Sequence, residues 1–447
     1  MSRPQADFSS LRELIATRAA HAGVIGLGYV GLPLAMAVVR AGYQVTGFDI
    51  DPEKIAKLGA GHSYIGAVSS QALNAATTSG RFTPTADFSG LGRCDVIIVC
   101  VPTPLTKHRE PDLSYIERTA ARIAETLRPG QLVILESTTY PGTTDEVLVP
   151  ILEKTRLRSG KDFFTGFSPE REDPGNADFE TVTIPKVVAG DGDASLELMK
   201  AFYGSVVRRI VPVSSNAAAE AVKLTENIFR SVNIALVNEL KIVYDAMGID
   251  IWEVIEAAKT KPFGFMPFYP GPGLGGHCIP IDPFYLTWKS REYGLPTRFI
   301  ELAGEINTSM PRFVFGKLMA ALDRQAGKAM SRAKILLVGL AYKRNVADIR
   351  ESPSLALIEL IEERGGKTEF HDPHVAEIPL TREHAKLAGR KSVLLDAATI
   401  SAFDAVLIST DHDAVDYGLL AKYSKLIVDT RNAMAKRGFA APHIIKA

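Results

Sequence analysis

One cysteine stands in a segment of unusual composition. Residues 270–283 read PGPGLGGHCIPIDP, so that Cys278 follows a run of glycines and prolines and precedes Asp282 by four residues. A thiolate is a strong nucleophile, and a glycine-rich loop lets a substrate approach its sulfur without a steric wall. Exposed backbone amides and a nearby lysine would favour the ionised thiol, and Asp282 can position a water or move a proton. The segment predicts covalent catalysis at Cys278.

A second set of polar residues shares one face of a predicted helix. Glu220, Lys223 and Asn227 are spaced i, i+3 and i+7, which places them on one side of the helix. An exposed polar stripe is the plain alternative. The apolar residues Val222 and Ile228 flank the stripe, so Lys223 can be partly desolvated, and a lysine in that setting stabilises an oxyanion or holds a carboxylate.

A nucleotide site is predicted near the start of the chain. Residues 26–31 read GLGYVG after an apolar run and before a helical pattern. Gly26, Gly28 and Gly31 allow a tight turn, close approach of a pyrophosphate, and close packing of helix on strand. Asp49 follows Gly31 by 18 residues, where a carboxylate binds a ribose diol and repels the extra phosphate of NADP. A purely structural turn explains the glycines but not Asp49, so dinucleotide binding with a preference for NAD is predicted.

Two hydroxyl-rich turns follow predicted strands. VPTP at 101–104 contains Thr103, and ESTTYPG at 136–142 contains Thr138. Ligands of an open α/β sheet lie beyond the carboxyl ends of the strands, so these turns are placed to line the cofactor site, although residues that merely cap the next helices would look the same. A hydride acceptor and a thiol in one chain predict a specific sequence: an alcohol becomes an aldehyde, then a hemithioacetal, then a thioester, then a carboxylate.

Composition limits the class of protein. The chain has 447 residues, and its 51 basic side chains balance 51 acidic ones, so no net charge attracts it to nucleic acid or to an anionic membrane. Three cysteines without a CxxC pair argue against a disulfide framework and against a thiolate metal site, and no metal is expected. Neither a membrane-spanning run nor a signal-like first segment is present. These features favour a cytoplasmic protein that acts on a small molecule.

Short β-branched runs alternate with helical patterns on both sides of a strand-free middle. GVIGLG, QVTGFDID, CDVIIVCVP and QLVILEST come before it, and KILLVGLAY, KTEFHDP, DAVLIST and KLIVDTR after it. Such runs are typical of parallel strands covered on both faces, and the second set repeats the order of the first. The expected fold is α/β. Two Rossmann-like doubly wound sheet domains, residues 1–214 and 316–447, are joined by a central helical domain, residues 215–315, with a long helix and the cysteine segment.

The ordered motifs resemble those of a known family. GVIGLGYVGLPLA, VPTP, ESTTYPGTT, SPERE, EAVKLTENIFRSVNIALVNE, GPGLGGHCIPIDP, GLAYKRNVADIRESP and VDTRN are similar, in this order, to segments of the UDP-glucose/GDP-mannose dehydrogenase family. Its members oxidise C6 of a nucleotide sugar to a carboxylate with two molecules of NAD. The resemblance implies this activity in surface polysaccharide synthesis, with NAD as cofactor and with a UDP-sugar held by the C-terminal domain.

The resemblance also implies roles for single residues. Cys278 would be the nucleophile, Lys223 and Asn227 would stabilise oxyanions, Asp282 and Thr138 would orient a water for proton transfer, and Glu170 would assist thioester hydrolysis. The implied cofactor contacts are Gly26, Gly28, Tyr29, Val30, Gly31, Asp49, Lys54, Thr103, Thr138 and Arg350. The implied contacts to the nucleotide sugar are Glu170, Arg171, Lys223, Asn227, Tyr269, Gly275, Lys343 and Arg431.

Two departures from the family pattern concern the sugar. SPEREDPGN is shorter than the family's SPEFLRE-like run, which leaves the role of Glu172 open, and KTKPFGFMPFYPGPG has lysines and aromatics where relatives often place an arginine. Both segments resemble the UDP-N-acetylglucosamine 6-dehydrogenase branch. Phe263, Phe265 or Phe268 would form an apolar wall for the acetamido methyl, or would be loop core. UDP-glucose and UDP-N-acetylmannosamine stay open as substrates.

Two other functions fit parts of the pattern. A single-hydride dehydrogenase of the β-hydroxyacid type shares the first sheet and the helical middle but needs no Cys278, and it would form one NADH per product instead of two. A non-catalytic nucleotide-sugar sensor would lack some of the residues of the active centre. The four residues expected there, Lys223, Asn227, Cys278 and Asp282, are all present. The long apolar helix in the middle favours a homodimer or a higher homo-oligomer.

Overall fold

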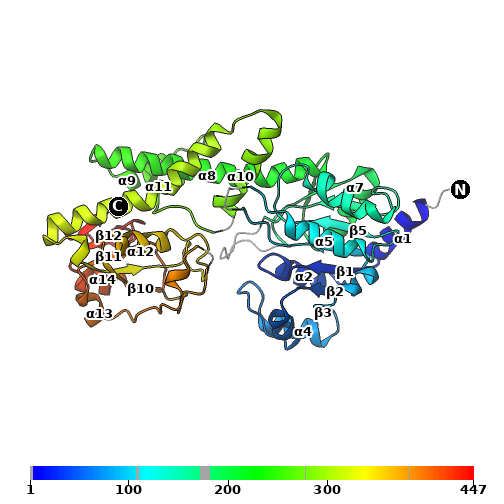
Figure 1. The fold of residues 1–447 in the computed structure, drawn as a ribbon, viewed down its shortest axis with the longest axis horizontal. Helices are drawn as coiled ribbons and strands as arrows, with labels where there is room; N and C mark the ends of the chain where they lie inside the picture. The colour runs from blue at the N-terminus through cyan, green and yellow to red at the C-terminus, as the bar shows by residue number, and fades with distance from the viewer. Residues whose placement is uncertain (1–3, 107–109, 172–181, 277, 382) are drawn as a thin grey trace. The chain divides into compact units, whose positions relative to one another are not determined.

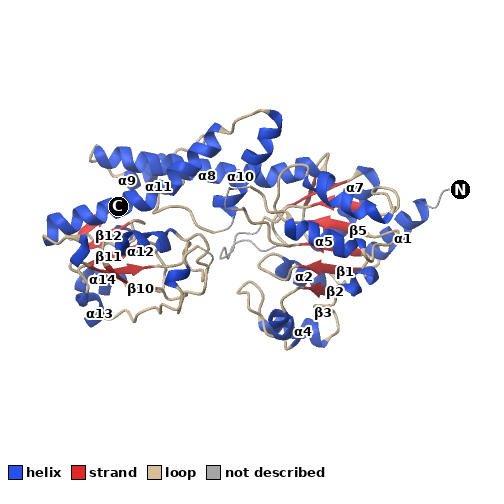
Figure 2. Ribbon diagram, in the orientation of Figure 1, coloured by secondary structure: helices blue, strands red, loops and turns tan. Residues whose placement is uncertain are grey.

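The computed structural model describes residues 4–106, 110–171, 182–276, 278–381 and 383–447. The chain divides into two compact units: Met1–Glu226 with Tyr285–Leu295, and Asn227–Phe284 with Pro296–Ala447. Each unit contains one extended sheet, drawn red in Figure 2, with helices around it. The expected α/β fold with two sheets is confirmed.

The sheet of the first unit has eight strands in the order β3-β2-β1-β4-β5-β6-β7-β8 (Figure 1). The strands are β1 His21–Ile25, β2 Gln44–Phe48, β3 Phe82–Thr85, β4 Val96–Val99, β5 Leu132–Leu135, β6 Phe164–Phe167, β7 Lys186–Gly190 and β8 Ile210–Pro212. All neighbours are parallel except β6 and β7. The first six strands have the 3-2-1-4-5-6 order of dinucleotide-binding folds, in which the ligand crevice lies at the carboxyl ends of β1 and β4.

Helices cover both faces of this sheet. They are α1 Pro4–Ala16, α2 Gly31–Arg40, α3 Pro52–Gly59, α4 Ser70–Thr78, α5 Ser114–Ala124, α6 Val149–Leu152 and α7 Gly192–Val206. Val24 and Ile98 enter a core with residues of α1, α2 and α7, whereas Ile25 and Ile97 enter a core with residues of α5 and α6. Burial on both faces explains why the strands are continuously apolar in sequence.

The second unit has a five-stranded, all-parallel sheet in the order β10-β9-β11-β12-β13. The strands are β9 Lys334–Val338, β10 Lys367–His371, β11 Ala405–Ile408, β12 Ile427–Asp429 and β13 Ile444–Lys446. The helices are α9 Ile251–Ala258, α11 Arg298–Ala321, α12 Pro353–Glu363, α13 Ala397–Ala402 and α14 Tyr417–Tyr423. Its strand order is that of a doubly wound sheet whose switch point lies between β9 and β11.

Two helices belong to both units. The long helix α8 runs Asn216–Ala246, and α10 runs Cys278–Ser290. The long helix expected in the middle of the chain is therefore present. It ends at Ala246, and Gly248 just after it has φ +72°, a conformation that favours a helix end. Within the described residues, no strand lies between β8 and β9. No described helix is long and apolar enough to cross a membrane.

The internal similarity seen in the sequence has a structural counterpart. Gly26 follows β1 with φ +88°, and Gly339 follows β9 with φ +84°. A Cβ at Gly26 would lie 2.4 Å from the Cys100 carbonyl oxygen, and one at Gly339 would lie 2.2 Å from the Thr410 carbonyl oxygen. In both sheets the first strand therefore ends in a turn that only glycine can make.

Candidate active site

The GLGYVG segment forms the turn between β1 and α2. A Cβ at Gly31 would lie 1.8 Å from the Gly26 carbonyl oxygen, so packing inside the turn requires glycine there. A Cβ at Gly28 would meet nothing within 4 Å. Protein packing therefore gives no reason for Gly28, whereas a ligand that approaches the backbone closely does. The turn fits a pyrophosphate at the N-terminus of α2, whose first turn has no acidic residue.

Asp49 lies just after β2, is buried, and is oriented by backbone amides. Its Oδ2 accepts a hydrogen bond from Leu27 N at 2.9 Å, and its Oδ1 accepts one from Asp51 N at 3.0 Å. Lys54 Nζ is 3.6 Å from Oδ2. The carboxylate is thus fixed beside the glycine turn, where it can accept hydrogen bonds from the hydroxyls of a ribose. These residues fit NAD.

The other predicted cofactor contacts fall on the same edge of the first sheet, with one exception. Thr103 follows β4 and is buried, and Thr138 follows the adjacent strand β5 and is half-buried. Tyr285 of α10 donates a hydrogen bond to the Thr103 carbonyl oxygen at 2.6 Å, which fixes the first turn. Tyr29 and Val30 lie in the glycine turn itself. Arg350 is in the second unit and pairs with Asp348 at 2.6 Å, so its contact with NAD stays a prediction.

The polar stripe of α8 is buried. Glu220, Lys223 and Asn227 are 0%, 7% and 7% exposed, so the alternative of a solvated stripe is wrong. Glu220 accepts hydrogen bonds from Gly142 N at 2.5 Å, Thr144 N at 2.9 Å and Thr144 Oγ1 at 2.7 Å. Burial raises the pKa of Glu220 to about 7, although these donors oppose the shift. Glu220 therefore anchors the ESTTYPG turn to α8, a role that the sequence did not reveal.

Lys223 stands out among the buried cations. No hydrogen bond or ion pair joins its side chain to any residue within the described ranges. Asn227 follows it by one helical turn on α8, so both side chains leave the same face of the helix. A largely buried lysine residue without a protein carboxylate is suited to a negative charge on a ligand or an intermediate.

Cys278 begins helix α10 and does not lie within a loop. The helix puts positions 278 and 282 one turn apart on the same face. Its N-terminus also favours a thiolate at the first position, in addition to the loop amides expected from the sequence. Asp282 is 1% exposed and accepts a hydrogen bond from Asn227 Nδ2 at 2.6 Å. The structure thus brings Asn227 to Asp282, one turn from the backbone of Cys278.

Buried amides far away in the sequence hold the segment before Cys278. Gly271 N donates to Asn238 Oδ1 at 3.0 Å, and Asn238 Nδ2 donates to Asn307 Oδ1 at 2.9 Å. Both asparagines are buried, and Gly276 N donates to the Arg350 carbonyl oxygen at 2.8 Å. Sequence reasoning missed these anchors. Asn238, an amide directly after the apolar run IALV, was an available signal.

Replacing Gly275 by alanine is expected to displace this segment. A Cβ there would lie 2.4 Å from Tyr342 Cβ and 3.0 Å from the Glu351 carbonyl oxygen, and neither is the end of a flexible side chain. We expect Gly275→Ala to lose about 1–3 kcal/mol of stability and to lower kcat/KM at least about tenfold, measured by thermal unfolding and initial rates. Gly316→Ala is the control: its Cβ would meet nothing within 4 Å on α11, so it should gain about 0.5–1 kcal/mol. Equal behaviour of the two variants would contradict the expected clash.

Glu170 and Arg171 follow β6. Glu170 is 8% exposed, and its Oε1 accepts a hydrogen bond from Arg171 N at 2.6 Å. The Arg171 guanidinium binds both carboxylate oxygens of Glu226 on α8, at 2.5 and 3.3 Å, and donates to the Pro185 carbonyl oxygen at 2.7 Å. Arg171 therefore ties the SPERE turn to α8, and its contact with the sugar stays a prediction. Glu172 lies outside the described residues.

Four of the residues predicted to hold the nucleotide sugar, Tyr269, Gly275, Lys343 and Arg431, divide into two places within the second unit. Arg431 follows β12, donates to the Ser409 carbonyl oxygen at 2.9 Å, and lies against the backbone of Gly271. Gly275 packs on Tyr342, the neighbour of Lys343 in the turn after β9. These three predicted residues therefore gather at the carboxyl edge of the second sheet. Tyr269 is elsewhere: its ring stacks on Trp252 of α9, and its hydroxyl donates to Glu256 Oε1 at 2.8 Å.

The carboxylate that corresponds to Asp49 in the second sheet is Asp372. Its Oδ2 accepts hydrogen bonds from Leu340 N at 2.7 Å and Ala341 N at 2.9 Å and lies 3.0 Å from His412 Nε2. Burial opposes its charge, but the hydrogen bonds from His412 and the amides outweigh burial and lower the pKa of Asp372. Asp372 thus has three protein partners at Oδ2 alone, whereas Asp49 accepts one backbone hydrogen bond at each oxygen, so Asp372 is less available to a ribose than Asp49 is.

The other two cysteines are not suited to be nucleophiles. Burial raises the pKa of Cys94 to about 12 and that of Cys100 well above its ordinary value. Thiols that stay protonated at neutral pH react slowly. Among the three cysteines, Cys278 therefore stays the predicted nucleophile.

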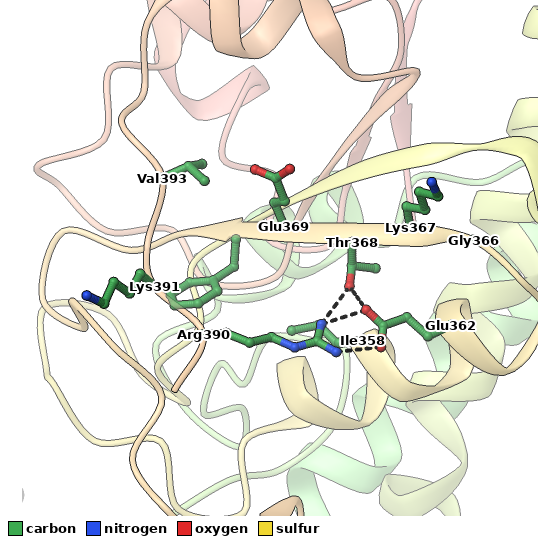
Figure 3. Close-up of a pocket in the computed structure, with 10 residues that line it drawn as sticks. Ile358, Glu362, Gly366, Lys367, Thr368, Glu369, Arg390, Lys391 and Val393 are labelled. Carbon is green, nitrogen blue, oxygen red and sulfur yellow. Dashed lines mark hydrogen bonds and ion pairs between the residues drawn. The ribbon is translucent and has the colours of Figure 1, made fainter. Parts of the chain in front are cut away.

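A pocket of about 610 Å³ lies on the second unit, away from these residues (Figure 3). It is lined by Ile358, Glu362, Gly366, Lys367, Thr368, Glu369, Phe370, Arg390, Lys391 and Val393. It follows the edge strand β10 along its length instead of the carboxyl ends of the strands. Arg390, at its centre in Figure 3, binds both oxygens of Glu362 at 2.6 and 2.8 Å. None of the residues predicted from the sequence lines this pocket.

Comparison with known proteins assigns each part of the chain. Residues 20–207 match the NAD binding domain of the UDP-glucose/GDP-mannose dehydrogenase family, residues 217–309 match its central domain, and residues 336–436 match its UDP binding domain. The three matches together contain every residue predicted to act on cofactor or sugar.

Individual relatives cover nearly the whole chain. A UDP-N-acetyl-D-glucosamine 6-dehydrogenase of Pseudomonas aeruginosa is 36% identical over 87% of this chain and 90% of its own. A UDP-N-acetyl-D-mannosamine dehydrogenase of Pyrococcus horikoshii is 36% identical over 92% of this chain and 94% of its own. A solved structure of the UDP-D-ManNAc dehydrogenase from Pyrococcus horikoshii covers 95% of this chain and 98% of its own, with a TM-score of 0.85 and 35% identity.

Proposed function

Because the chain belongs to the UDP-glucose/GDP-mannose dehydrogenase family, it is an NAD-dependent nucleotide-sugar 6-dehydrogenase, and we propose that its substrate is UDP-N-acetyl-D-glucosamine. The product would be UDP-N-acetyl-D-glucosaminuronate, for surface polysaccharide synthesis. The observation that carries the chemistry is Cys278 at the start of α10, one turn before a buried Asp282 that is bound to Asn227.

NAD, when bound, supplies the hydride acceptor for two oxidations, so two NADH form per uronate. The protein's part begins with proton transfer. We propose that Asp282 and Thr138 orient a water that takes the proton of the C6 hydroxyl as the aldehyde forms. The buried Asp282 is suited to this because its hydrogen bond from Asn227, 2.6 Å long, fixes its direction.

The covalent steps fall to Cys278. Its thiolate adds to the aldehyde carbon, and the C–S bond turns the carbonyl oxygen into an alkoxide. Lys223 and Asn227, one turn apart on α8, would stabilise that oxyanion. Loss of a second hydride gives the thioester. Water then adds to the thioester carbon, with Glu170 taking one of its protons, and the C–S bond breaks to return the thiolate. The carboxylic acid that forms loses its remaining proton to solvent and leaves as the carboxylate.

The choice of sugar rests on likeness and on local composition. The Pseudomonas aeruginosa relative named for UDP-N-acetyl-D-glucosamine and the Pyrococcus horikoshii relative named for the mannosamine sugar are equally identical to this chain, at 36%. The two substrates differ only in configuration at C2, and both carry the acetamido group that UDP-glucose lacks. The segments SPEREDPGN and KPFGFMPFYPGPG favour the glucosamine sugar.

A panel of UDP-sugars tests the proposal. Initial rates of NADH formation are measured with UDP-N-acetylglucosamine, UDP-N-acetylmannosamine and UDP-glucose, and NADH is counted against uronate. We expect kcat/KM to be at least about tenfold higher for UDP-N-acetylglucosamine than for either alternative, with two NADH per uronate. A higher value for the mannosamine sugar would reassign the substrate. One NADH per product would instead favour a single-hydride dehydrogenase.

We also infer a homodimer and a division of labour along the chain. α8 exposes Phe229, Leu236 and Val243 at intervals of seven residues, which form a single apolar stripe that a second copy would cover. Sedimentation as a monomer at assay concentrations would contradict this. Residues 1–214 would bind NAD, residues 215–315 would carry Cys278, and residues 316–447, with Lys343 and Arg431, would bind UDP.

A further inference from the structure

A buried ionic cluster lies beside Glu170 in the first unit, and none of the steps above uses it. Lys186 Nζ is 2.8 Å from Glu136 Oε2 and 3.7 Å from Glu170 Oε2. The side chains of Lys186, Glu136 and Glu170 are 5%, 0% and 11% exposed. Tyr203 of α7 donates a hydrogen bond to Glu136 Oε1, and Lys186 Nζ lies 5.4 Å from the centre of its ring. One cation is thus shared between two buried carboxylates.

The topology of the sheet explains how Lys186 reaches Glu170. β7 is antiparallel to β6, with Phe167 opposite Ala189. Continuing this register past the end of β6 puts Glu170 opposite Lys186, the first residue of β7. If β7 were parallel to β6, as the other neighbouring strands of this sheet are to each other, its first residue would lie at the opposite edge of the sheet. The reversed strand therefore brings a lysine to the carboxyl edge, where the ligands of such sheets bind.

The charges around the cluster favour an ammonium at its centre. Burial opposes the charge on Lys186, but Glu136 and Glu170 outweigh burial and raise the pKa of the lysine. Burial raises the pKa of Glu136, while Lys186 opposes that shift. Burial also raises the pKa values of the neighbouring Cys100 and Tyr203, which keeps both neutral. Arg171, which follows Glu170 in the chain, is paired with Glu226.

We propose that Lys186 is a positioning residue for thioester hydrolysis, whose ammonium holds the Glu170 carboxylate in place, while Glu136 and Tyr203 hold Lys186. The inference rests on the proposed role of Glu170. In this step the water oxygen bonds to the thioester carbon, one water proton passes to the Glu170 carboxylate, and the C–S electron pair returns to sulfur as the thiolate; nothing is oxidised or reduced. Without Lys186, the Glu170 carboxylate is no longer held where it can take this proton, so loss of Lys186 slows hydrolysis and spares the earlier steps.

Lys186→Met tests the inference. Protein quenched during turnover with NAD and the preferred UDP-sugar is examined by intact-protein mass spectrometry. We expect the sugar thioester on Cys278 to accumulate, and steady-state turnover to fall at least about tenfold, while the first rapid burst of NADH is retained. Lys186→Arg, which places another cation beside Glu170, should restore thioester breakdown and turnover.

A paired variant separates this role from a structural one. Lys186→Met leaves Glu136 as a buried charge without its cation, so Lys186→Met/Glu136→Gln removes both charges and keeps the hydrogen bond from Tyr203. Accumulation of thioester in the double variant supports the inference, and it does so even if the single variant does not fold. If the double variant clears the thioester as fast as the parent, Lys186 serves only Glu136 and the inference fails. If Glu170→Gln gives no adduct either, the proposed hydrolysis by Glu170 fails instead.

Discussion

Cys278→Ala is expected to lower the rate of uronate formation by roughly 10⁴-fold or more, because the aldehyde can no longer be held as a hemithioacetal for the second oxidation. Cys278 stands at the start of α10, and a helix N-terminus favours negative charge. Uronate and NADH are counted together over a long incubation. Any residual NADH should then match free aldehyde and not carboxylate, which distinguishes loss of the nucleophile from loss of the fold.

Cys94→Ala is the matched control for this variant. Cys94 is fully buried, so its loss leaves a small cavity that costs about 1 kcal/mol and should leave turnover unchanged. Iodoacetamide gives an independent reading, because Cys94, with a pKa of about 12, should react far more slowly than Cys278. Two NADH per uronate at near-parental rates in Cys278→Ala would remove the covalent scheme altogether.

The strands could be predicted because their information is local. Runs such as VIIV and LVIL are buried on both faces of the sheet, and two-sided burial leaves a pattern that is visible within a few residues. The glycine turn and Asp49 were also readable, since the turn requires glycine for steric reasons at Gly26 and Gly31. The reversed direction of β7 was not readable, because strand direction depends on how the connection passes over the sheet.

The candidate site was readable only in part, for a related reason. The residue types of Cys278, Lys223 and Asn227 indicate a reactive site, and the helical spacing of Lys223 and Asn227 is present in α8. The residues that hold the site in place carry no such signal in the sequence. Glu220 caps a turn 76 residues before it, and Lys186 pairs with a carboxylate 50 residues before it. Such contacts depend on tertiary packing, which neither the spacing nor the type of a single residue encodes.

Lys223→Met is expected to lower kcat by about 10²–10³-fold, or about 2.7–4 kcal/mol of transition-state stabilisation. Lys223 is 7% exposed, and no carboxylate among the described residues pairs with it, so we expect its charge to be available to the oxyanion that forms when sulfur adds to the aldehyde. Because that charge exists only after addition, KM should change much less than kcat. Lys223→Arg should not restore the rate, since a planar guanidinium cannot replace a compact ammonium at a fixed point.

Lys241→Met supplies the control on the same helix. Lys241 is also buried, and its pKa is lowered by burial, but it has a partner in Asp245 at 4.0 Å. Its loss should therefore reduce stability and leave kcat close to that of the parent. If both variants lost turnover equally, the effect would belong to α8 as a structural element. If Lys223→Met stayed within about threefold of the parent, oxyanion stabilisation would have to come from Asn227 and the backbone amides at the start of α10.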